Sequence, residues 1–189
     1  MKIYYIVNAI TVYRLASSPV LILLAFTHQL DIFKWMLAVS FFTDAIDGPL
    51  ARRYKVKSIA GAKLDYISYD MTVLAGIIGM IAFKREFLLQ HITPIIVLLA
   101  LFVVQVSLAF WKFHKMTSFH TYAAKLAALS QGVFLILFFF LGEQLETLFY
   151  FTIAITALDL VEEIILVLVI RQWATDVKGL YWVLRKKQH

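Results

Sequence analysis

Long runs of apolar residues, separated by short polar stretches, dominate this sequence. A helix needs about 20 mostly apolar residues to cross a hydrocarbon core of about 30 Å. Six runs reach about that length: Val12–Leu30, Phe33–Leu50, Ile59–Phe83, Ile92–Trp111, Tyr122–Leu141 and Leu148–Ile170. The pattern therefore predicts an all-α polytopic membrane protein, a bundle of six transmembrane helices that forms a single domain over residues 1–189.

The composition agrees with a chain embedded in lipid. Of the 189 residues, 62% are hydrophobic and 16% are charged, which is too little polar surface for a soluble globule. There is no cysteine, which excludes disulfides and cysteine-based metal sites. Asn8, Thr11 and Arg14 interrupt the first apolar run and no small-residue cleavage site follows, so we expect it to be retained rather than removed as a signal peptide. Residues 1–13 could instead form an amphipathic stretch at the membrane interface.

The basic residues predict an orientation in the membrane. Most of the 18 Lys and Arg flank the amino terminus and the second, fourth and carboxyl-terminal connections, whereas Lys34, Lys84 and Arg85 flank the others. By the positive-inside rule, both termini and the connection from Arg52 to Lys63 are cytoplasmic. The net charge of +6 suits anionic lipid headgroups. No nucleic-acid-binding motif accompanies it, so no nucleic-acid partner is expected.

A polar segment at the second connection carries the chemistry. On a helix Asp44, Asp47 and Ala51 share one face, with Gly48 beside them. Carboxylate oxygens are the ligands that Mg²⁺, Mn²⁺ and Ca²⁺ prefer. Small residues next to the carboxylates let a ligand approach the backbone. This face therefore predicts a site for a divalent cation.

The same segment also offers a phosphate-binding group and a second acidic turn. Arg52 supplies a planar donor fork suited to phosphate. Gly61 and Asp65 repeat the small-then-acidic arrangement at the start of the third helix. We therefore expect the second and third helices to converge on one site.

Together these residues resemble the signature of the CDP-alcohol phosphatidyltransferases, DxxDGxxAR, eight residues, then GxxxDxxxD. The matching positions are Asp44, Asp47, Gly48, Ala51, Arg52, Gly61 and Asp65. The amino-terminal positions Asn8, Thr11, Arg14 and Pro19 resemble the Asn-x-x-Thr-x-x-Arg pattern with which the family's first helix begins. The resemblance implies transfer of a phosphatidyl group from CDP-diacylglycerol or another CDP-alcohol to a small alcohol, with release of CMP. It further implies a homodimer in the lipid bilayer, and a bacterial inner membrane is the expected location.

The resemblance also implies roles for individual residues. Two divalent cations, Mg²⁺ or Mn²⁺, would be held by Asp44, Asp47 and Asp65. The CDP-binding positions would be Asn8, Thr11, Arg14, Gly48, Ala51, Arg52 and Gly61. The last Asp of the signature is the proposed general base.

At that last position the chain departs from the pattern, because Tyr69 stands where the family has Asp and Asp70 follows one residue late. One step along a helix rotates a side chain by about 100°. Three interpretations stay open. Residue 69 has been changed from Asp and Asp70 is a second acid nearby; Asp70 serves as the base through a π-bulge; or the chain is a non-catalytic relative that still binds metal and CDP-lipid. We take Asp70 as the candidate base.

Three further features leave alternatives open. Pro49 either frees the Ala45 carbonyl or marks a helix near its end. Lys125 either faces a cavity or reaches the headgroups, while His114 and His120 are expected on the surface. Acidic residues share a face in the sixth run, where they could pair with a base, line a cavity or meet a second subunit, and they keep a polytopic transporter as a third function. These residues are Asp159, Glu162 and Glu163.

Overall fold

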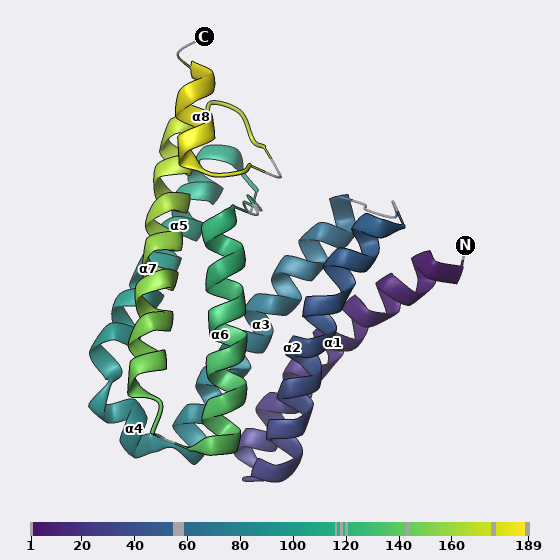
Figure 1. The fold of residues 1–189 in the computed structure, drawn as a ribbon, viewed down its shortest axis with the longest axis vertical. Coiled ribbons are helices and arrows are strands. Elements are labelled where there is room, and N and C mark those ends of the chain that lie inside the picture. The colour runs from purple at the N-terminus through teal and green to yellow at the C-terminus, as the bar shows by residue number, and fades with distance from the viewer. Residues whose placement is uncertain are drawn as a thin grey trace. The chain divides into compact units, whose positions relative to one another are not determined.

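The computed structural model describes the backbone of residues 2–54, 59–115, 117, 119, 121–142, 144–174 and 177–187. Side chains are described for residues 12–46, 54, 64, 67–115, 117, 119, 121–142, 144–174 and 177–185. Within these ranges the chain forms eight α-helices and no strand (Figure 1). The long helices are α1 (Lys2–Phe26), α2 (Leu30–Arg53), α3 (Ile59–Phe83), α5 (Ile92–Phe113), α6 (Tyr122–Leu141) and α7 (Glu146–Val169). The short ones are α4 (Arg85–Gln90) and α8 (Leu180–Lys187). The predicted all-α class is confirmed.

Each of the six apolar runs corresponds to one long helix, although the first run, Val12–Leu30, extends past the end of α1 at Phe26 to the first residue of α2. The predicted bounds of α3 and α6 agree with the structure at both ends, and α1 begins earlier than predicted, at Lys2. The short helices α4 and α8 were not predicted, because six and eight residues show too little periodicity.

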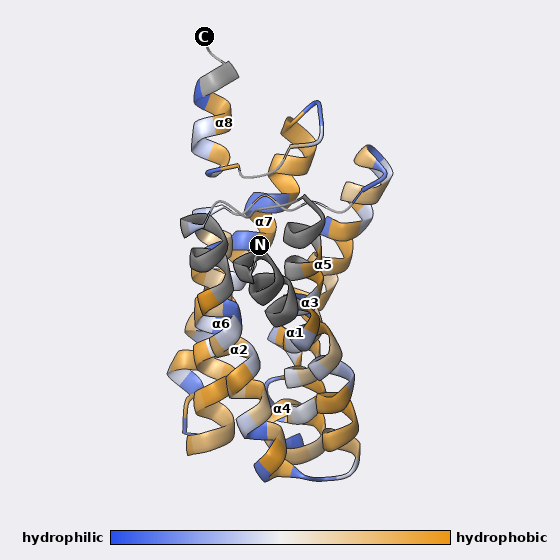
Figure 2. Cartoon of the chain, turned by 90° about the vertical axis from the view of Figure 1, so that its right-hand side faces the viewer, coloured by the Kyte–Doolittle hydropathy of each residue, from blue (hydrophilic) through white to orange (hydrophobic). Residues whose placement is uncertain are grey.

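Two helices meet the length and composition expected of a membrane span. Among the described residues these are α5 and α6, while Val12–Phe26 and Ile67–Phe83 form shorter apolar helical segments. Figure 2 shows that hydrophobic residues cover most of the long helices. Two candidate spans are thus supported, and the count of six stays a prediction.

The chain divides into two compact units, of which the first comprises Met1–Gln90 and Leu135–Gly142. In this unit α1 packs against α2 and α3, and α2 packs against α3. Phe33 is fully buried and its ring centroid lies 5.0 Å from that of Phe139. Gly79 makes room for it, because a Cβ there would lie 2.7 Å from Phe33 Cε1. Close helix packing around small residues is typical of membrane helices.

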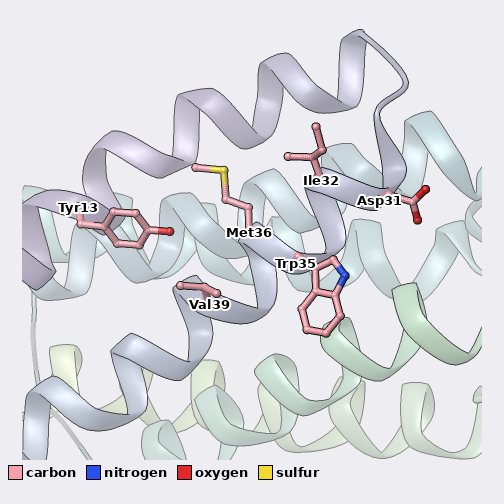
Figure 3. A pocket seen from close by; sticks show the side chains of 6 residues that line it. All are labelled: Tyr13, Asp31, Ile32, Trp35, Met36 and Val39. Carbon is pink, nitrogen blue, oxygen red and sulfur yellow. The ribbon is translucent and has the colours of Figure 1, made fainter.

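A shallow groove opens between α1 and α2 of this unit (Figure 3). It is lined by Tyr13 of α1 and by Asp31, Ile32, Trp35, Met36 and Val39 of α2. Trp35 is 63% exposed and Ile32 is 55% exposed. Exposed apolar surface of this kind fits a helix face that contacts lipid.

The second unit comprises His91–Phe134 and Glu143–His189. Helix α7 packs against α5 and contacts α8. The core of this unit includes the buried residues Ala109, Phe119, Leu166 and Val167. Lys112 Nζ donates hydrogen bonds to the carbonyl oxygens of Val167, at 2.8 Å, and Leu168, at 2.9 Å. Lys112 of α5 thereby satisfies carbonyl groups at the end of α7, which have no partner within their own helix.

Glu162 of α7 accepts a hydrogen bond from a backbone group rather than from a base. Its Oε1 accepts from the Leu180 backbone N–H at 2.8 Å, where α8 begins. Gly179 adopts φ +149° just before, and a Cβ there would lie 3.1 Å from the same oxygen. Glu162 therefore caps α8 from outside that helix, a partner that the sequence analysis had not considered.

The surface residues of this unit agree with the simpler alternatives. Lys125 is exposed and its Nζ lies 5.2 Å from the ring centroid of Tyr122. His114 is exposed and ends α5 in a left-handed conformation with φ 53°. His120 lies outside the described residues. The surface position predicted for His114 is confirmed, and the exposure of Lys125 favours the headgroup alternative.

Candidate functional site

The structure describes the side chains of three predicted site residues, Arg14, Asp44 and Asp70. The others lie in α1, α2 and α3, but their side chains lie outside the described residues. They are Asn8, Thr11, Asp47, Gly48, Ala51, Arg52, Gly61 and Asp65, and the same holds for Pro49. The roles assigned to these side chains stay predictions.

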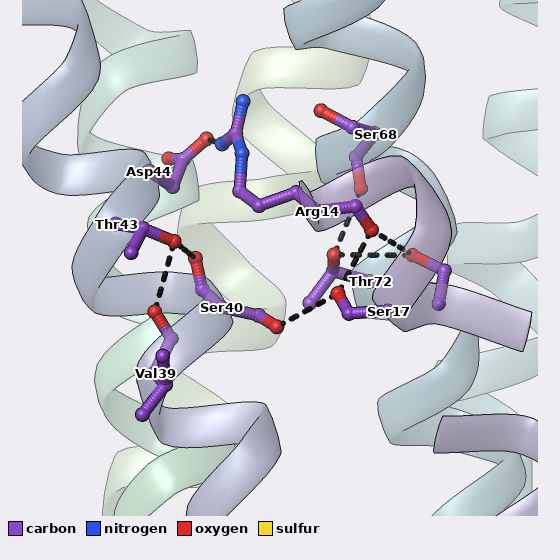
Figure 4. A network of polar contacts seen from close by, with 9 residues as sticks. Arg14, Ser17, Val39, Ser40, Thr43, Asp44, Ser68 and Thr72 are labelled. Carbon is purple, nitrogen blue, oxygen red and sulfur yellow. Dashed lines mark hydrogen bonds and ion pairs between the residues drawn. The ribbon is translucent and has the colours of Figure 1, made fainter. Parts of the chain in front are cut away.

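An ion pair joins the amino-terminal pattern to the main motif. Nη1 of Arg14, on α1, pairs with Oδ1 of Asp44, on α2 (Figure 4). The Arg14 side chain is 0% exposed, whereas that of Asp44 is 26% exposed. A buried guanidinium requires an opposite charge nearby, because transfer of a charge out of water costs several kcal/mol. Two segments that the sequence separates are thus brought together in one site.

Buried hydroxyl groups surround the backbone of Arg14. Its carbonyl oxygen accepts hydrogen bonds from Ser17 Oγ at 2.9 Å and from Ser18 Oγ at 3.1 Å. Ser17 Oγ also lies 3.1 Å from Ser40 Oγ of α2, and Ser18 Oγ lies 3.5 Å from Thr72 Oγ1 of α3. The turn of α1 that follows Arg14 is therefore linked to both neighbouring helices.

The sequence analysis missed this hydroxyl layer. Its members are short polar residues about one turn apart within apolar helices, which is a detectable signal. They are Ser17 and Ser18 on α1, Ser40 on α2, and Ser68 and Thr72 on α3, where Thr72 Oγ1 donates to the Ser68 carbonyl at 2.8 Å. We considered the charged residues within the apolar runs but not these serines and threonines.

These contacts set the register of the three helices. The pairs Arg14–Asp44 and Ser17–Ser40 run in opposite directions along α1 and α2, which are antiparallel. The Ser18–Thr72 pair fits an α3 that runs parallel to α1. One further turn toward the start of α1, the same register brings position 11 of α1 level with position 47 of α2 and position 65 of α3. The register thus supports the expectation that the second and third helices bring their motif positions to one level.

Helix α3 is a regular α-helix from Ile59 to Phe83, with no π-turn in that range. The π-bulge proposed to carry Asp70 into the place of residue 69 is therefore wrong, and Asp70 keeps its rotation of about 100°. The Tyr69 ring packs edge-on against Phe41 of α2, with centroids 6.1 Å apart. Position 69 thus points toward α2 and carries a phenol, while Asp70 lies on a different face of α3.

The described part of the site supplies one candidate metal ligand. Within the described residues no group of three His, Cys, Asp or Glu could hold a metal ion. Asp44 is partly exposed and offers a carboxylate, the ligand type that a hard divalent cation prefers. The predicted ligands Asp47 and Asp65 have side chains outside the described residues. The Asp44 carboxylate suits Mg²⁺ or Mn²⁺ by the chemistry of its oxygen donors, and the set of three ligands stays a prediction.

Comparison with known proteins adds the family. No solved structure matches this chain. Residues 4–177 match the family model for CDP-alcohol phosphatidyltransferase, a match that covers most of the chain and includes every predicted site residue. The chain therefore belongs to the CDP-alcohol phosphatidyltransferase family of membrane-integral transferases that act in phospholipid biosynthesis.

Proposed function

We propose that the protein transfers a phosphatidyl, or related substituted phosphate, group from a CDP-linked lipid to a small alcohol and releases CMP. Family membership supports the general reaction. The observation that carries the proposal for this chain is the Arg14–Asp44 ion pair, which joins the amino-terminal pattern to the acidic motif. CDP-diacylglycerol is the donor that we expect.

The acidic motif would hold the cations and its small residues would accept the nucleotide. Asp44, Asp47 and Asp65 are the proposed ligands of Mg²⁺ or Mn²⁺. Bound cations would neutralise the diphosphate and stabilise the charge that develops on departing CMP. The CDP moiety would contact Asn8, Thr11, Gly48, Ala51, Arg52 and Gly61. Arg14, which the resemblance also implied as a CDP contact, is left out of this set because its side chain is 0% exposed.

The reaction is a displacement at the phosphorus that carries the lipid. The alcohol oxygen forms a new bond to this phosphorus, and the bond from it to the bridging oxygen of the diphosphate breaks, so that CMP leaves with the electron pair. The alcohol proton passes to a general base. We propose that Asp70 takes this role from its own face of α3, one residue after position 69, since α3 has no π-bulge that would carry it into that position. The Tyr69 phenol is a poor base, since an isolated phenol loses its proton only at about pH 10.

A second candidate function is a non-catalytic relative that binds metal and CDP-lipid. The observation in its favour is that Tyr69 packs against Phe41 at the position where the family has its last Asp, in an α3 without a bulge. Affinity for metal and CDP-lipid without CMP release would establish this second function.

We further infer six spans with both termini and the site on the cytoplasmic side, in a homodimer of a bacterial inner membrane. The distribution of Lys and Arg supports this orientation. The transporter alternative is less favoured, since Glu162, one of the three acids that prompted it, caps α8. Substrate flux into sealed vesicles would revive it.

The test is CMP release by the purified protein in detergent with CDP-diacylglycerol, Mg²⁺ or Mn²⁺ and a panel of alcohols. The unaltered chain is compared with Tyr69→Asp and Asp70→Ala. Asp31→Ala is the control, because Asp31 is an exposed acid at the far end of α2. CMP release by the unaltered chain and by Asp31→Ala, but not by Asp70→Ala, supports Asp70 as the base. Activity that appears only in Tyr69→Asp contradicts turnover by this chain and favours the binding function.

A further inference from the structure

We propose that Arg14 is a positioning residue that orients the Asp44 carboxylate toward a divalent cation. This inference rests on the proposed function, because it assumes that Asp44 is a metal ligand. It differs from the role that the family resemblance implied for Arg14, which was direct contact with CDP.

The burial of the pair separates the two roles. The guanidinium is 0% exposed while the carboxylate is 26% exposed, so an incoming ligand reaches Asp44 and not Arg14. The contact from Nη1 goes to one carboxylate oxygen, Oδ1. Arg14 therefore acts through Asp44 by way of their ion pair, as other groups that contact metal ligands act through those ligands.

Hydrogen bonds link the backbone of Arg14 to both neighbouring helices. Its carbonyl oxygen accepts from Ser17 and Ser18, and these hydroxyls reach Ser40 of α2 and Thr72 of α3 (Figure 4). Ser40 lies one turn before Asp44 on the same helix. Helices α1 and α2 are thus joined at two successive levels, one by a hydrogen bond and one by the ion pair.

Two physical effects of Arg14 on cation binding have opposite signs. A positive charge beside a ligand repels a cation, so removal of the charge alone would tighten binding. Loss of the hydrogen bond that orients a metal ligand weakens binding, by about 10- to 100-fold in characterised sites. The direction of change therefore distinguishes a positioning residue from a group that acts only through its charge.

The experiment measures Mn²⁺ binding by electron paramagnetic resonance on the purified full chain in detergent, without lipid substrate. The variants are Arg14→Gln and Arg14→Lys, each also made in an Asp44→Asn background. Lys34→Gln is the control, because it removes a positive charge from α2 whose partner is the exposed Asp31, at 2.6 Å. Thermal unfolding of every variant is followed in parallel.

We expect Arg14→Gln to weaken Mn²⁺ binding by about tenfold or more. Arg14→Lys, which keeps the charge but lacks the planar fork, should weaken it less. In the Asp44→Asn background neither change should weaken binding further, and Lys34→Gln should have no effect. If Arg14→Gln does not fold, the test relies on Arg14→Lys, compared with and without Asp44→Asn.

Several results would overturn the proposal. They are unchanged or tighter Mn²⁺ binding in both Arg14 variants, an equal loss in the Asp44→Asn background, and no Mn²⁺ binding by the unaltered chain. Mn²⁺ binding that depends on Arg14, in a chain that releases no CMP, would instead overturn only the catalytic function proposed above.

Discussion

Two acidic residues in apolar helices, Asp44 in the first unit and Glu162 in the second, have different kinds of partner. Asp44 pairs with the charged guanidinium of Arg14, which lies on another helix and is 0% exposed. Glu162 accepts from a backbone N–H at 2.8 Å, at the first residue of α8. The first contact joins two charges, and the second joins a charge to a helix end.

The difference shows that an acid in an apolar helix is not by itself a sign of chemistry. A carboxylate at a helix amino terminus is stabilised by the unpaired N–H groups and the helix dipole. Glu162 has this partner and belongs to no motif. Asp44 is matched by a charge from a second motif and keeps part of its surface accessible. Partner type and accessibility together distinguish the candidate site residue from the structural one.

The largest expected effect comes from neutralising Asp44. Asp44→Asn removes the carboxylate that pairs with the buried Arg14 guanidinium, and breaking a buried pair in this way costs about 3–5 kcal/mol. We expect a marked fall in the thermal unfolding temperature in detergent and loss of CMP release. Asp31→Asn is the matched control, because its pair with Lys34 lies at the surface, where ion pairs contribute little. Equal unfolding temperatures for Asp44→Asn and Asp31→Asn would contradict the view that the buried pair contributes more to stability than the surface pair.

A smaller and local effect is expected at Glu162. Glu162→Ala removes the acceptor of the Leu180 N–H, at a cost of about 1 kcal/mol confined to α8. Hydrogen exchange should become faster in residues 180–187, while Mn²⁺ binding and CMP release stay unchanged. Glu162→Gln retains an acceptor oxygen and should protect α8 better than Ala does. Loss of activity in Glu162→Ala would show that the second unit also contributes to the chemistry.

The smallest effect is expected in the hydroxyl layer. Ser17→Ala removes the contacts to Ser40 and to the Arg14 carbonyl, and side-chain hydrogen bonds between membrane helices contribute about 0.6 kcal/mol on average. The unfolding temperature should fall slightly, and Mn²⁺ affinity should fall too if this layer helps to hold Arg14. Ser107→Ala, at an exposed serine of α5, is the control and should change neither quantity. A large loss of stability in Ser17→Ala would show that the hydroxyl layer stabilises the protein as much as the Arg14–Asp44 ion pair does.

Helix positions followed from the sequence where long apolar runs end in polar residues. Both ends of α3 and of α6 were predicted correctly for this reason. The early start of α1 was missed, because the predicted run began at Val12 and residues 1–13 were left as a possible amphipathic stretch at the interface. The structure has one helix from Lys2 through Phe26.

The sequence by itself determined the helical class, the six long helices and the family signature, because hydrophobic periodicity and motif spacing are local properties of the chain. Only the tertiary structure decided which groups pair across helices. It joined Arg14 to Asp44, turned Tyr69 toward Phe41 and placed Glu162 at the start of α8. The physical reason is that these partners depend on helix register and packing, which no single segment of the sequence specifies.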